Sequence, residues 1–256
     1  MSGLVFVDGE QVAWPGPARI DDPNARPGLG LFETMRARRG AVPLLSRHLA
    51  RLTASASALG LPCRSAAAIR HLVGAAISGV GTGDHRVRLV LNETGQIVVD
   101  VNPFEAGTTQ VRLTTVLGPV QVEGFAEHKT TAYLPYIRAR EHAVASGAHH
   151  ALLVRPDGAV LEADHGSVVA LIGGDLVTPH AADILPGIAR TLLIQRLGIT
   201  QERLAVGDII DAGAVYVVNA LRGVAIVVDL DGESLRQSAT ELERIERGLP
   251  ELHTAM

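Results

Sequence analysis

Apolar residues along the first hundred positions recur at the spacings of short strands and amphipathic helices. Asp8-Gly9 and Thr94-Gly95 are typical turn sequences, and each joins two apolar runs, which predicts two hairpins. The expected elements here are strands at Leu4–Val7, Gln11–Trp14, Arg86–Leu91 and Ile97–Val101, a helix after the N-cap Ser46 that stops at Gly60, and a helix from about Ser65 to Ile77. Between the hairpin and the first helix, the glycine-rich stretch Pro27 to Gly40 is expected to lead from a loop into a strand.

The hydrophobic pattern lapses between Asn102 and Gly107, and a domain boundary is expected there. We predict an α+β protein with a small N-terminal α/β domain at 1–104 and a larger C-terminal domain at 105–256. The second half has strands at Gln110–Val116, Ala214–Val218 and Val224–Asp229, helices from about Tyr133 to Ser146 and from Gly187 to Gly198, hairpin turns at Asp157-Gly158 and Gly173-Gly174, and a last helix after the capping box Ser238-x-x-Glu241.

The composition excludes several classes of protein. A net charge of −4 and only 3% aromatic residues do not suit a nucleic-acid binder. The single cysteine, Cys63, permits no internal disulfide and no cysteine-based zinc site, and no histidine spacing typical of a metal site occurs. The N-terminus lacks the basic start of a signal peptide, and the most apolar stretch contains Asn219 and Arg222, so we expect a cytoplasmic protein without a membrane span.

Lys129 is the only lysine in the chain, and every other basic residue counted with it is an arginine. A genome biased toward arginine replaces lysine wherever only a positive charge is needed. A retained lysine then indicates a position where arginine cannot serve, because a lysine amine can lose its proton and act as a nucleophile. The ordinary interpretation, a solvated surface lysine, is weakened by this uniqueness.

Two further features of the second half suit the same chemistry as Lys129. Glu162 is predicted at the end of a hairpin strand, and the segment Leu185 to Arg190 opens a helix whose backbone N–H groups could hold a phosphate. Taken singly, the first could be a surface carboxylate and the second a plain turn before a helix. Together, an amine, a carboxylate and a phosphate site favour a carbonyl cofactor that carries a phosphate.

With these residues in place, the sequence resembles the fold-type IV pyridoxal 5′-phosphate enzymes, the group related to branched-chain and D-amino-acid aminotransferases. The resemblance covers nearly the whole chain and keeps the order of the motifs. The matching segments are FETMR at 32–36, LLSRHLARL at 44–52, HKTTAY at 128–133, DGAVLEADHGSVV at 157–169, TPHAADILPGIAR at 178–190 and VVNALRGVAIV at 217–227.

The resemblance implies a role for each matching residue. Lys129 would be the Schiff-base lysine and would move the substrate's α-proton, and Arg51 would hold the cofactor phosphate. Tyr133 would lie near the 3′-oxygen of the cofactor, and Glu162 would bind its pyridine nitrogen. The other implied cofactor contacts are Ser167, Gly187, Ile188, Ala189 and Ala220, and the implied substrate contacts are Phe32, Thr34, Arg36, Arg88, Leu221 and Arg222. The resemblance further implies a homodimer with the site in the cleft between the domains, closed by the partner's N-terminal loop.

Several positions depart from the usual pattern of the family: alanine stands at 132 and 189, serine at 167, and Pro27 and Leu29 replace residues that are often aromatic and acidic. Within the family, the motif NALRG and the compact length are most similar to aminodeoxychorismate lyases. Such a lyase eliminates pyruvate from 4-amino-4-deoxychorismate and leaves 4-aminobenzoate for folate biosynthesis, and Arg36, Arg88 and Arg222 are candidate partners for the two substrate carboxylates. The alternatives are an aminotransferase for branched-chain or D-amino acids and a catalytically idle relative that binds a phosphorylated ligand.

Overall fold

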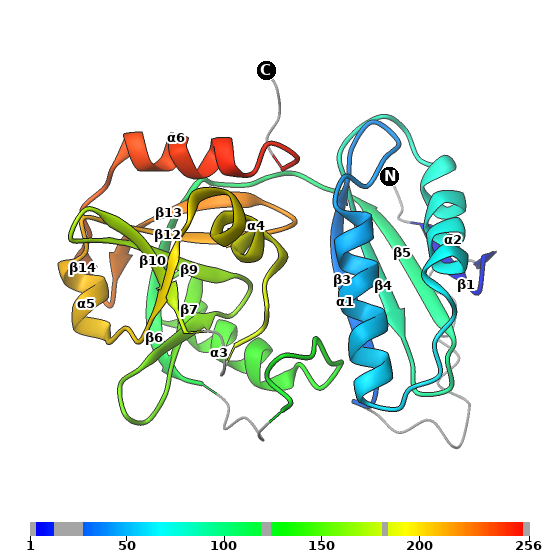
Figure 1. The fold of residues 1–256 in the computed structure, drawn as a ribbon, viewed down its shortest axis with the longest axis horizontal. Coiled ribbons are helices and arrows are strands. Elements are labelled where there is room, and N and C mark those ends of the chain that lie inside the picture. Colours follow the sequence, from blue (N-terminus) through cyan, green and yellow to red (C-terminus); the bar gives the residue numbers. More distant parts are fainter. Residues whose placement is uncertain (1–3, 13–27, 119–123, 181–183, 253–256) are drawn as a thin grey trace. The chain divides into compact units, whose positions relative to one another are not determined.

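The computed structural model describes residues 4–12, 28–118, 124–180 and 184–252. These residues form two compact units (Figure 1). The first unit is Met1–Glu105 together with His128–Ala132, and the second is Ala106–Glu127 together with Tyr133–Met256. Both units combine helices with a mainly antiparallel sheet, as expected for the α+β class.

The first unit contains an antiparallel sheet covered on one face by two helices (Figure 1). Its strands, in the order β2-β1-β5-β4-β3, are β1 (Leu4–Val7), β2 (Glu10–Val12), β3 (Leu31–Ala37), β4 (His85–Leu91) and β5 (Ile97–Pro103), and its helices are α1 (Leu45–Ala58) and α2 (Ala66–Ser78). Leu31 and Met35 of β3 share a core with Leu49 of α1. Because side chains alternate along a strand, Phe32, Thr34 and Arg36 project from the opposite face of the sheet.

The second unit is built on a longer sheet that encloses its own core. Its strands are β6 (Gln110–Leu117), β7 (His150–Val154), β8 (Val160–Ala163), β9 (Ser167–Ile172), β10 (Asp175–Pro179), β11 (Thr200–Glu202), β12 (Ala214–Asn219), β13 (Gly223–Leu230) and β14 (Glu233–Ser234). They lie in the order β11-β10-β9-β12-β13-β6-β7-β8, with β14 paired to β13. Val177 of β10 and Val160 of β8 belong to one apolar cluster with Val111, which shows that the sheet curls around this core.

Four helices accompany this sheet: α3 (Leu134–Ala145), α4 (Ile188–Leu197), α5 (Val206–Asp211) and α6 (Ala239–Gly248). Ile209 of α5 completes the apolar cluster inside the sheet, whereas Ala139 and Ala143 of α3 pack with Leu153 in a separate cluster on the other side of β7. None of the described helices is long and apolar enough to cross a membrane.

Of the two predicted N-caps, Ser238 is confirmed and Ser46 is not. The Ser65 hydroxyl accepts a hydrogen bond from the backbone N–H of Ala68 at the start of α2, and Ser238 does the same for Glu241 at the start of α6. Ser46 was wrong as a cap, because α1 begins two residues earlier, after Leu44. The Ser46 hydroxyl instead accepts a hydrogen bond from Arg70 of α2.

Most of the predicted strands and helices are present, with ends shifted by one to three residues. The second predicted strand ends at Val12, and Trp14 lies outside the described residues. The short elements β11, α5 and β14 were not predicted, because each is too brief to show a repeating pattern.

Candidate active site

Lys129 is attached by backbone hydrogen bonds to the edge of the first unit's sheet. The carbonyl of Lys129 accepts a hydrogen bond from the N–H of Phe32 at 2.9 Å, and the N–H of Thr131 donates to Gly30 at 2.8 Å. β3 is the last strand of its sheet, and these bonds extend that edge by a short antiparallel bridge. This pairing explains why the segment around Lys129 belongs to the first unit, although it lies at positions where the sequence pattern predicts the second domain.

The amine of Lys129 lies over an aromatic ring that a second cation also contacts. Its Nζ is 4.4 Å from the centroid of the Phe32 ring, and the guanidinium carbon of Arg88 is 4.3 Å from the same centroid. Thr34 is paired with Arg88 across the two strands, so it lies on the same face of the sheet. One face of the first unit therefore carries four of the implied site residues: Phe32, Thr34, Arg88 and Lys129.

Arg36 lies on this face as well, but its side chain is bound by the carboxylate of Asp84. Its guanidinium forms an ion pair with Asp84, and the Nε of Arg38 bonds to the same carboxylate at 3.0 Å. Burial favours a higher pKa for Asp84, but the hydrogen bonds from Arg38 and Arg36 outweigh it and lower that pKa. Arg36 also contacts the ring of Phe104 at 5.4 Å. The positive charge of Arg36 is therefore largely neutralised within the first unit.

Arg51 is bound to Glu33 on the opposite face of β3, beneath α1. Its Nε and Nη2 donate to the two carboxylate oxygens at 2.8 and 2.6 Å, and Nδ1 of His48 is 2.7 Å from one of them. Glu33 is 1% exposed. Burial alone favours a higher pKa for Glu33, but the charge of Arg51 and the hydrogen bonds from His48 and Arg51 lower it to about 2. Burial lowers the pKa of His48, so its ring is neutral at pH 7.

Glu33 and His48 were not among the predicted site residues. The sequence contains a weak signal for them, since His48 and Arg51 are three residues apart on one helix and share a face. Nothing in the sequence pattern places a buried carboxylate of β3 opposite that face.

In the second unit, two tyrosines connect the start of α3 to Glu162. Tyr133 precedes the first helical residue, and its hydroxyl donates to the carbonyl of Asp164 at 2.8 Å. Its ring stacks on that of Tyr136, with centroids 4.6 Å apart and planes inclined by 6°. The hydroxyl of Tyr136 donates to Oε1 of the buried Glu162 at 3.2 Å. The stacked pair therefore fixes the orientation of this carboxylate.

The first turn of α4 has the geometry of a phosphate-binding site. Gly187 occupies the N-cap position, and as a glycine it supplies no side-chain cap for the first N–H groups of the helix. A Cβ at position 187 would lie 2.5 Å from the hydroxyl oxygen of Ser167, so the backbone approaches Ser167 as closely as only glycine permits. Ile188 and Ala189, the first two helical residues, are buried. Backbone donors, a helix dipole and a serine hydroxyl are thus gathered in one place.

A turn at the end of β12 is held by the side chain of Asn219. Its Oδ1 accepts hydrogen bonds from the N–H groups of Leu221 and Arg222 at 3.0 and 2.8 Å. These two bonds fix the backbone of Ala220, the residue between. The guanidinium of Arg222 donates to the carbonyl of Ala106 at 2.8 Å.

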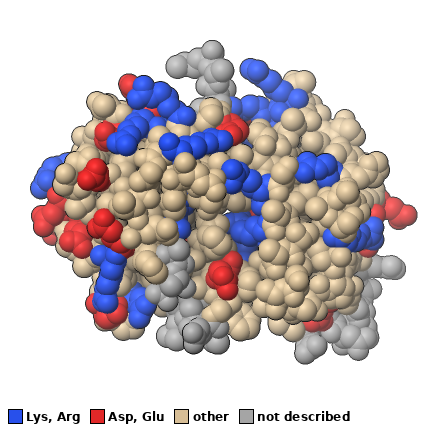
Figure 2. Space-filling model, viewed as in Figure 1, with Lys and Arg blue, Asp and Glu red and all other residues tan. Residues whose placement is uncertain are grey.

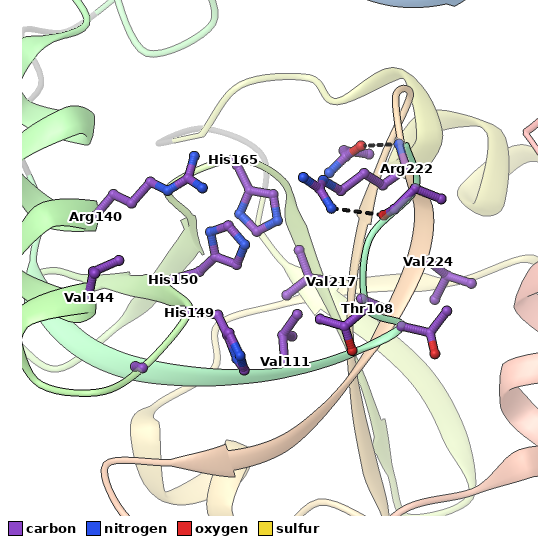
Figure 3. A pocket seen from close by; sticks show the side chains of 15 residues that line it. Thr108, Val111, Arg140, Val144, His149, His150, His165, Val217, Arg222 and Val224 are labelled. Atoms are coloured by element: carbon purple, nitrogen blue, oxygen red, sulfur yellow. Dashed lines mark hydrogen bonds between the residues drawn. The ribbon is translucent and has the colours of Figure 1, made fainter. Parts of the chain in front are cut away.

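A cavity of about 360 Å³ opens in the second unit beside this turn (Figure 3). Its lining includes His149, His150 and His165, none of which is among the residues predicted for the site. His150 is buried on β7, and its ring stacks on that of His165 with centroids 3.5 Å apart. Sequence neighbourhood could not reveal this cluster, because β7 and the turn after β8 meet only in the folded sheet.

Known proteins with the same fold identify the family. The family description "Amino-transferase class IV" matches residues 30–230. A bifunctional aminodeoxychorismate lyase / D-amino acid transaminase from Mycobacterium tuberculosis is 28% identical over 268 residues, which cover 91% of this chain and 92% of the relative. A hypothetical aminotransferase from the same organism, solved in its PLP-bound form, is 27% identical with a TM-score of 0.85 over 97% of this chain and 98% of that chain.

A branched-chain aminotransferase from Thermoproteus uzoniensis has the same fold, with 22% identity and a TM-score of 0.84 over 97% of this chain and 94% of that chain. The protein therefore belongs to the class IV aminotransferase family, and the expected fold-type IV architecture is confirmed. It is a pyridoxal-phosphate-dependent enzyme of the lyase or aminotransferase kind.

The described residues fit this cofactor. A phosphate suits the open first turn of α4 with Ser167 beside it, and a pyridine nitrogen suits a buried carboxylate such as Glu162. The amine of Lys129 is a nucleophile of the kind that a carbonyl group requires.

Proposed function

We propose that the protein is a pyridoxal-phosphate-dependent lyase that converts 4-amino-4-deoxychorismate to 4-aminobenzoate and pyruvate. The observation that carries the proposal is the turn at 219–222, where Asn219 fixes the backbone of Ala220 and Leu221 through two hydrogen bonds. These residues form the Asn-Ala-Leu motif that resembles the lyases of the family. The relative whose name includes this lyase activity supports the proposal over nearly its whole length.

In this proposal, Lys129 would be the residue attached to the cofactor, and Arg51 would bind its phosphate group. The phosphate would also be held by Ser167, Gly187, Ile188 and Ala189, and the ring would be contacted by Glu162, Tyr133 and Ala220. The bound cofactor supplies an electron sink, which stabilises negative charge at the carbon next to the substrate's amino group.

The chain's own residues then position the groups and move the protons. The Lys129 amine takes a proton from substrate carbon and returns one to product, which requires its neutral form. Tyr136 holds Glu162 by a hydrogen bond, so that the carboxylate keeps one orientation while charge develops elsewhere. Glu33 fixes the plane of the Arg51 guanidinium by two hydrogen bonds. Arg51 therefore loses little conformational entropy when it binds a phosphate.

The substrate of this lyase carries two carboxylates, and we assign one of them to Arg88. Arg222 is a weaker candidate, because its guanidinium donates to the carbonyl of Ala106 and lines the cavity beside the 219–222 turn. Arg36 is the weakest of the three predicted partners, because Asp84 already neutralises it. Phe32, Thr34 and Leu221 contribute shape rather than charge. The proposed assembly is a homodimer, which size-exclusion chromatography with light scattering tests directly.

A transaminase activity on D-amino acids is the second candidate. One observation favours it, since the relative from Mycobacterium tuberculosis carries both activities in its name. A protein with either activity uses the same cofactor residues, and the two differ in what leaves the substrate.

The discriminating experiment supplies purified enzyme with 4-amino-4-deoxychorismate, and separately with a D-amino acid and a 2-oxo acid. The lyase proposal predicts equal amounts of pyruvate and 4-aminobenzoate in the first assay. Amino exchange in the second assay without product in the first contradicts the lyase proposal and supports the transaminase. If the protein takes up the cofactor but forms no product in either assay, both substrate assignments are contradicted. That result supports the catalytically idle alternative.

A further inference from the structure

The cavity of the second unit, which we call the cationic pocket, is lined by positive and titratable side chains. Arg140 of α3 and Arg222 extend into it from opposite sides, toward the stacked rings of His150 and His165 (Figure 3). None of the fifteen described residues that line it is acidic. The apolar part of the lining is formed by Ala106, Val111, Val144, Ala148, Val217, Val224 and Ala225.

The charges around the cationic pocket repel one another. Burial lowers the pKa of Arg222, and the charge of Arg140 lowers it further. Burial also lowers the pKa of His165; the hydrogen bond and charge of Asp164 work against this shift, whereas the charges of His150 and Arg140 lower the pKa further. In the described part of the chain, no carboxylate forms an ion pair with Arg140. Lys and Arg side chains mark several places on the visible face of the protein (Figure 2), but the cationic pocket combines two guanidinium groups with an apolar wall.

A metal ion is the first alternative, since one ligand atom each from His150, Asp164 and His165 lie within 4.8 Å of one another. The geometry argues against it. The two imidazole rings are stacked with planes inclined by 21°, so the rings pack against each other rather than around an ion. Nδ1 of each ring also lies 3.2 Å from Oδ1 of Asp164, which uses the carboxylate as their common acceptor.

The cationic pocket lies on the opposite face of the sheet from the phosphate-binding turn. Val217 lines the pocket, whereas the next residue, Val218, is paired with Ser167, which lies against Gly187. Successive strand residues point to opposite faces, so the two sites are separated by the sheet itself. Neither Glu162 nor Ser167 lines the cationic pocket. It is therefore a second site, independent of the roles proposed for the cofactor residues.

We propose that the cationic pocket binds a small organic carboxylate with an apolar body, such as an aromatic acid. The carboxylate lies between Arg140 and Arg222, where a guanidinium offers charge-assisted hydrogen bonds, and the apolar body packs on Val111, Val144 and Val217. The cavity volume of about 360 Å³ exceeds the roughly 150 Å³ that suffices for a benzene ring.

The experiment measures binding of benzoate to the full chain by titration calorimetry, with benzamide as the neutral probe of the same shape. The protein is used cofactor-free and also after borohydride reduction of the cofactor-loaded form, in which the cofactor is held permanently. Benzoate is expected to bind once per chain in both forms, about tenfold or more tightly than benzamide, and more weakly as salt is raised. A protein that takes up no cofactor still permits the first titration, so failure of the proposed function leaves this test intact.

Two variants locate the binding. Arg140→Gln should weaken benzoate binding about tenfold, whereas Arg138→Gln, a control on the same helix with a side chain 74% exposed, should leave it unchanged. Val144→Asp places a negative charge at an exposed position of the lining and should weaken binding at least as much. The proposal is overturned by absence of saturable benzoate binding, by equal affinity for benzamide, by equal effects of the two arginine variants, or by stoichiometric Zn²⁺ binding that excludes benzoate.

Discussion

Arg51 lies with its Nε and Nη2 on the two carboxylate oxygens of Glu33, at 2.8 and 2.6 Å. The pair is almost closed to solvent, with Glu33 1% and Arg51 12% exposed, and His48 shares one of the oxygens. A planar guanidinium bound at two points can neither rotate nor withdraw without breaking both bonds. We therefore regard Glu33 as a positioning residue for Arg51, the proposed phosphate ligand from the first unit.

Removing the charge of Glu33 should destabilise the protein markedly. Glu33→Gln keeps the shape but leaves Arg51 without its buried counter-charge, which costs roughly 3 kcal/mol in the free energy of unfolding. Urea denaturation measures this change. The matched control is Glu141→Gln, which removes an exposed pair with Arg138 and should change stability by less than about 1 kcal/mol. Similar effects of the two variants would contradict the proposed importance of the buried pair.

The same pair makes the stability depend on acid. The pKa of Glu33 falls from an ordinary value of 4.5 to about 2 on folding, and that of Asp164 falls from 3.8 to about 2. For both carboxyls, burial works against the shift, whereas their arginine and histidine partners favour the ionised form. A lowered folded-state pKa adds stability above the unfolded-state value, and this stability is lost as the pH falls toward the folded-state value. Unfolding free energies should therefore drop between about pH 5 and pH 2.

Glu33→Gln should reduce the slope of this acid loss, because one of the carboxyls whose pKa folding lowers is then absent. The measurement is urea denaturation at a series of pH values for the wild type and the variant. An unchanged slope in the variant would mean that Glu33 does not titrate in this range.

The close approach of Gly187 to Ser167 predicts a severe effect of a single methyl group. In Gly187→Ala the new Cβ meets the Ser167 hydroxyl, whose oxygen is 2.5 Å away, so the first turn of α4 must shift. We expect a loss of roughly 1–3 kcal/mol in stability and weaker cofactor binding, measured by absorbance titration of the bound cofactor.

Two comparisons test the steric explanation. Gly207→Ala, at a helical position with nothing within 4 Å of the added Cβ, should leave cofactor binding unchanged. The double variant Gly187→Ala, Ser167→Gly removes the obstructing hydroxyl and should recover part of the lost stability. If the double variant is no more stable than Gly187→Ala, the clash is not the cause.

The hydrogen bond from Tyr136 to Glu162 should contribute to cofactor affinity. Tyr136→Phe keeps the stacked ring and removes only the hydroxyl, which should raise the dissociation constant of the cofactor about three- to tenfold. Tyr216→Phe is the matched control, because its hydroxyl donates to the carbonyl of Ser238 instead. The control should lose stability without a change in cofactor affinity, and equal losses of affinity would refute a specific role for Tyr136.

Much of the fold follows from the sequence, since long elements show their period and their caps. The helix from Ile188 to Leu197 is bounded by Gly187 and Gly198, as predicted. Gly198 has the left-handed backbone conformation, with φ at 67°, that favours glycine, whereas Gly187 has ordinary extended angles and is required by its close approach to Ser167. The helix at 206–211 was missed, because six residues are less than two turns and show no apolar stripe. The sequence also could not predict that residues 128–132 pack with the first unit, because this depends on backbone hydrogen bonds to the edge strand β3.

The residues of the candidate site could be predicted only where a residue type is rare in the chain or a sequence motif resembles the family. Lys129 was identified by its uniqueness and by the family resemblance, and Glu162 and Gly187 by resemblance and local pattern. Glu33 and His165 were missed, because a carboxylate on a strand and a histidine in a turn have no distinctive spacing. The partners of Glu33, His48 and Arg51, are 15 and 18 residues away in the sequence. The partner of His165 is His150 of β7, and only folding brings the two rings together.

The central claim is that the single lysine of the chain carries the cofactor. The direct measurement is borohydride reduction of the cofactor-loaded protein, followed by digestion and mass spectrometry of the peptide that contains Lys129. We predict that the mass of the reduced pyridoxyl phosphate group is found on Lys129 alone, and that Lys129→Arg, which keeps the positive charge, neither acquires this mass nor turns over substrate. An unmodified Lys129 in protein that has bound the cofactor, or activity retained by Lys129→Arg, would contradict the claim.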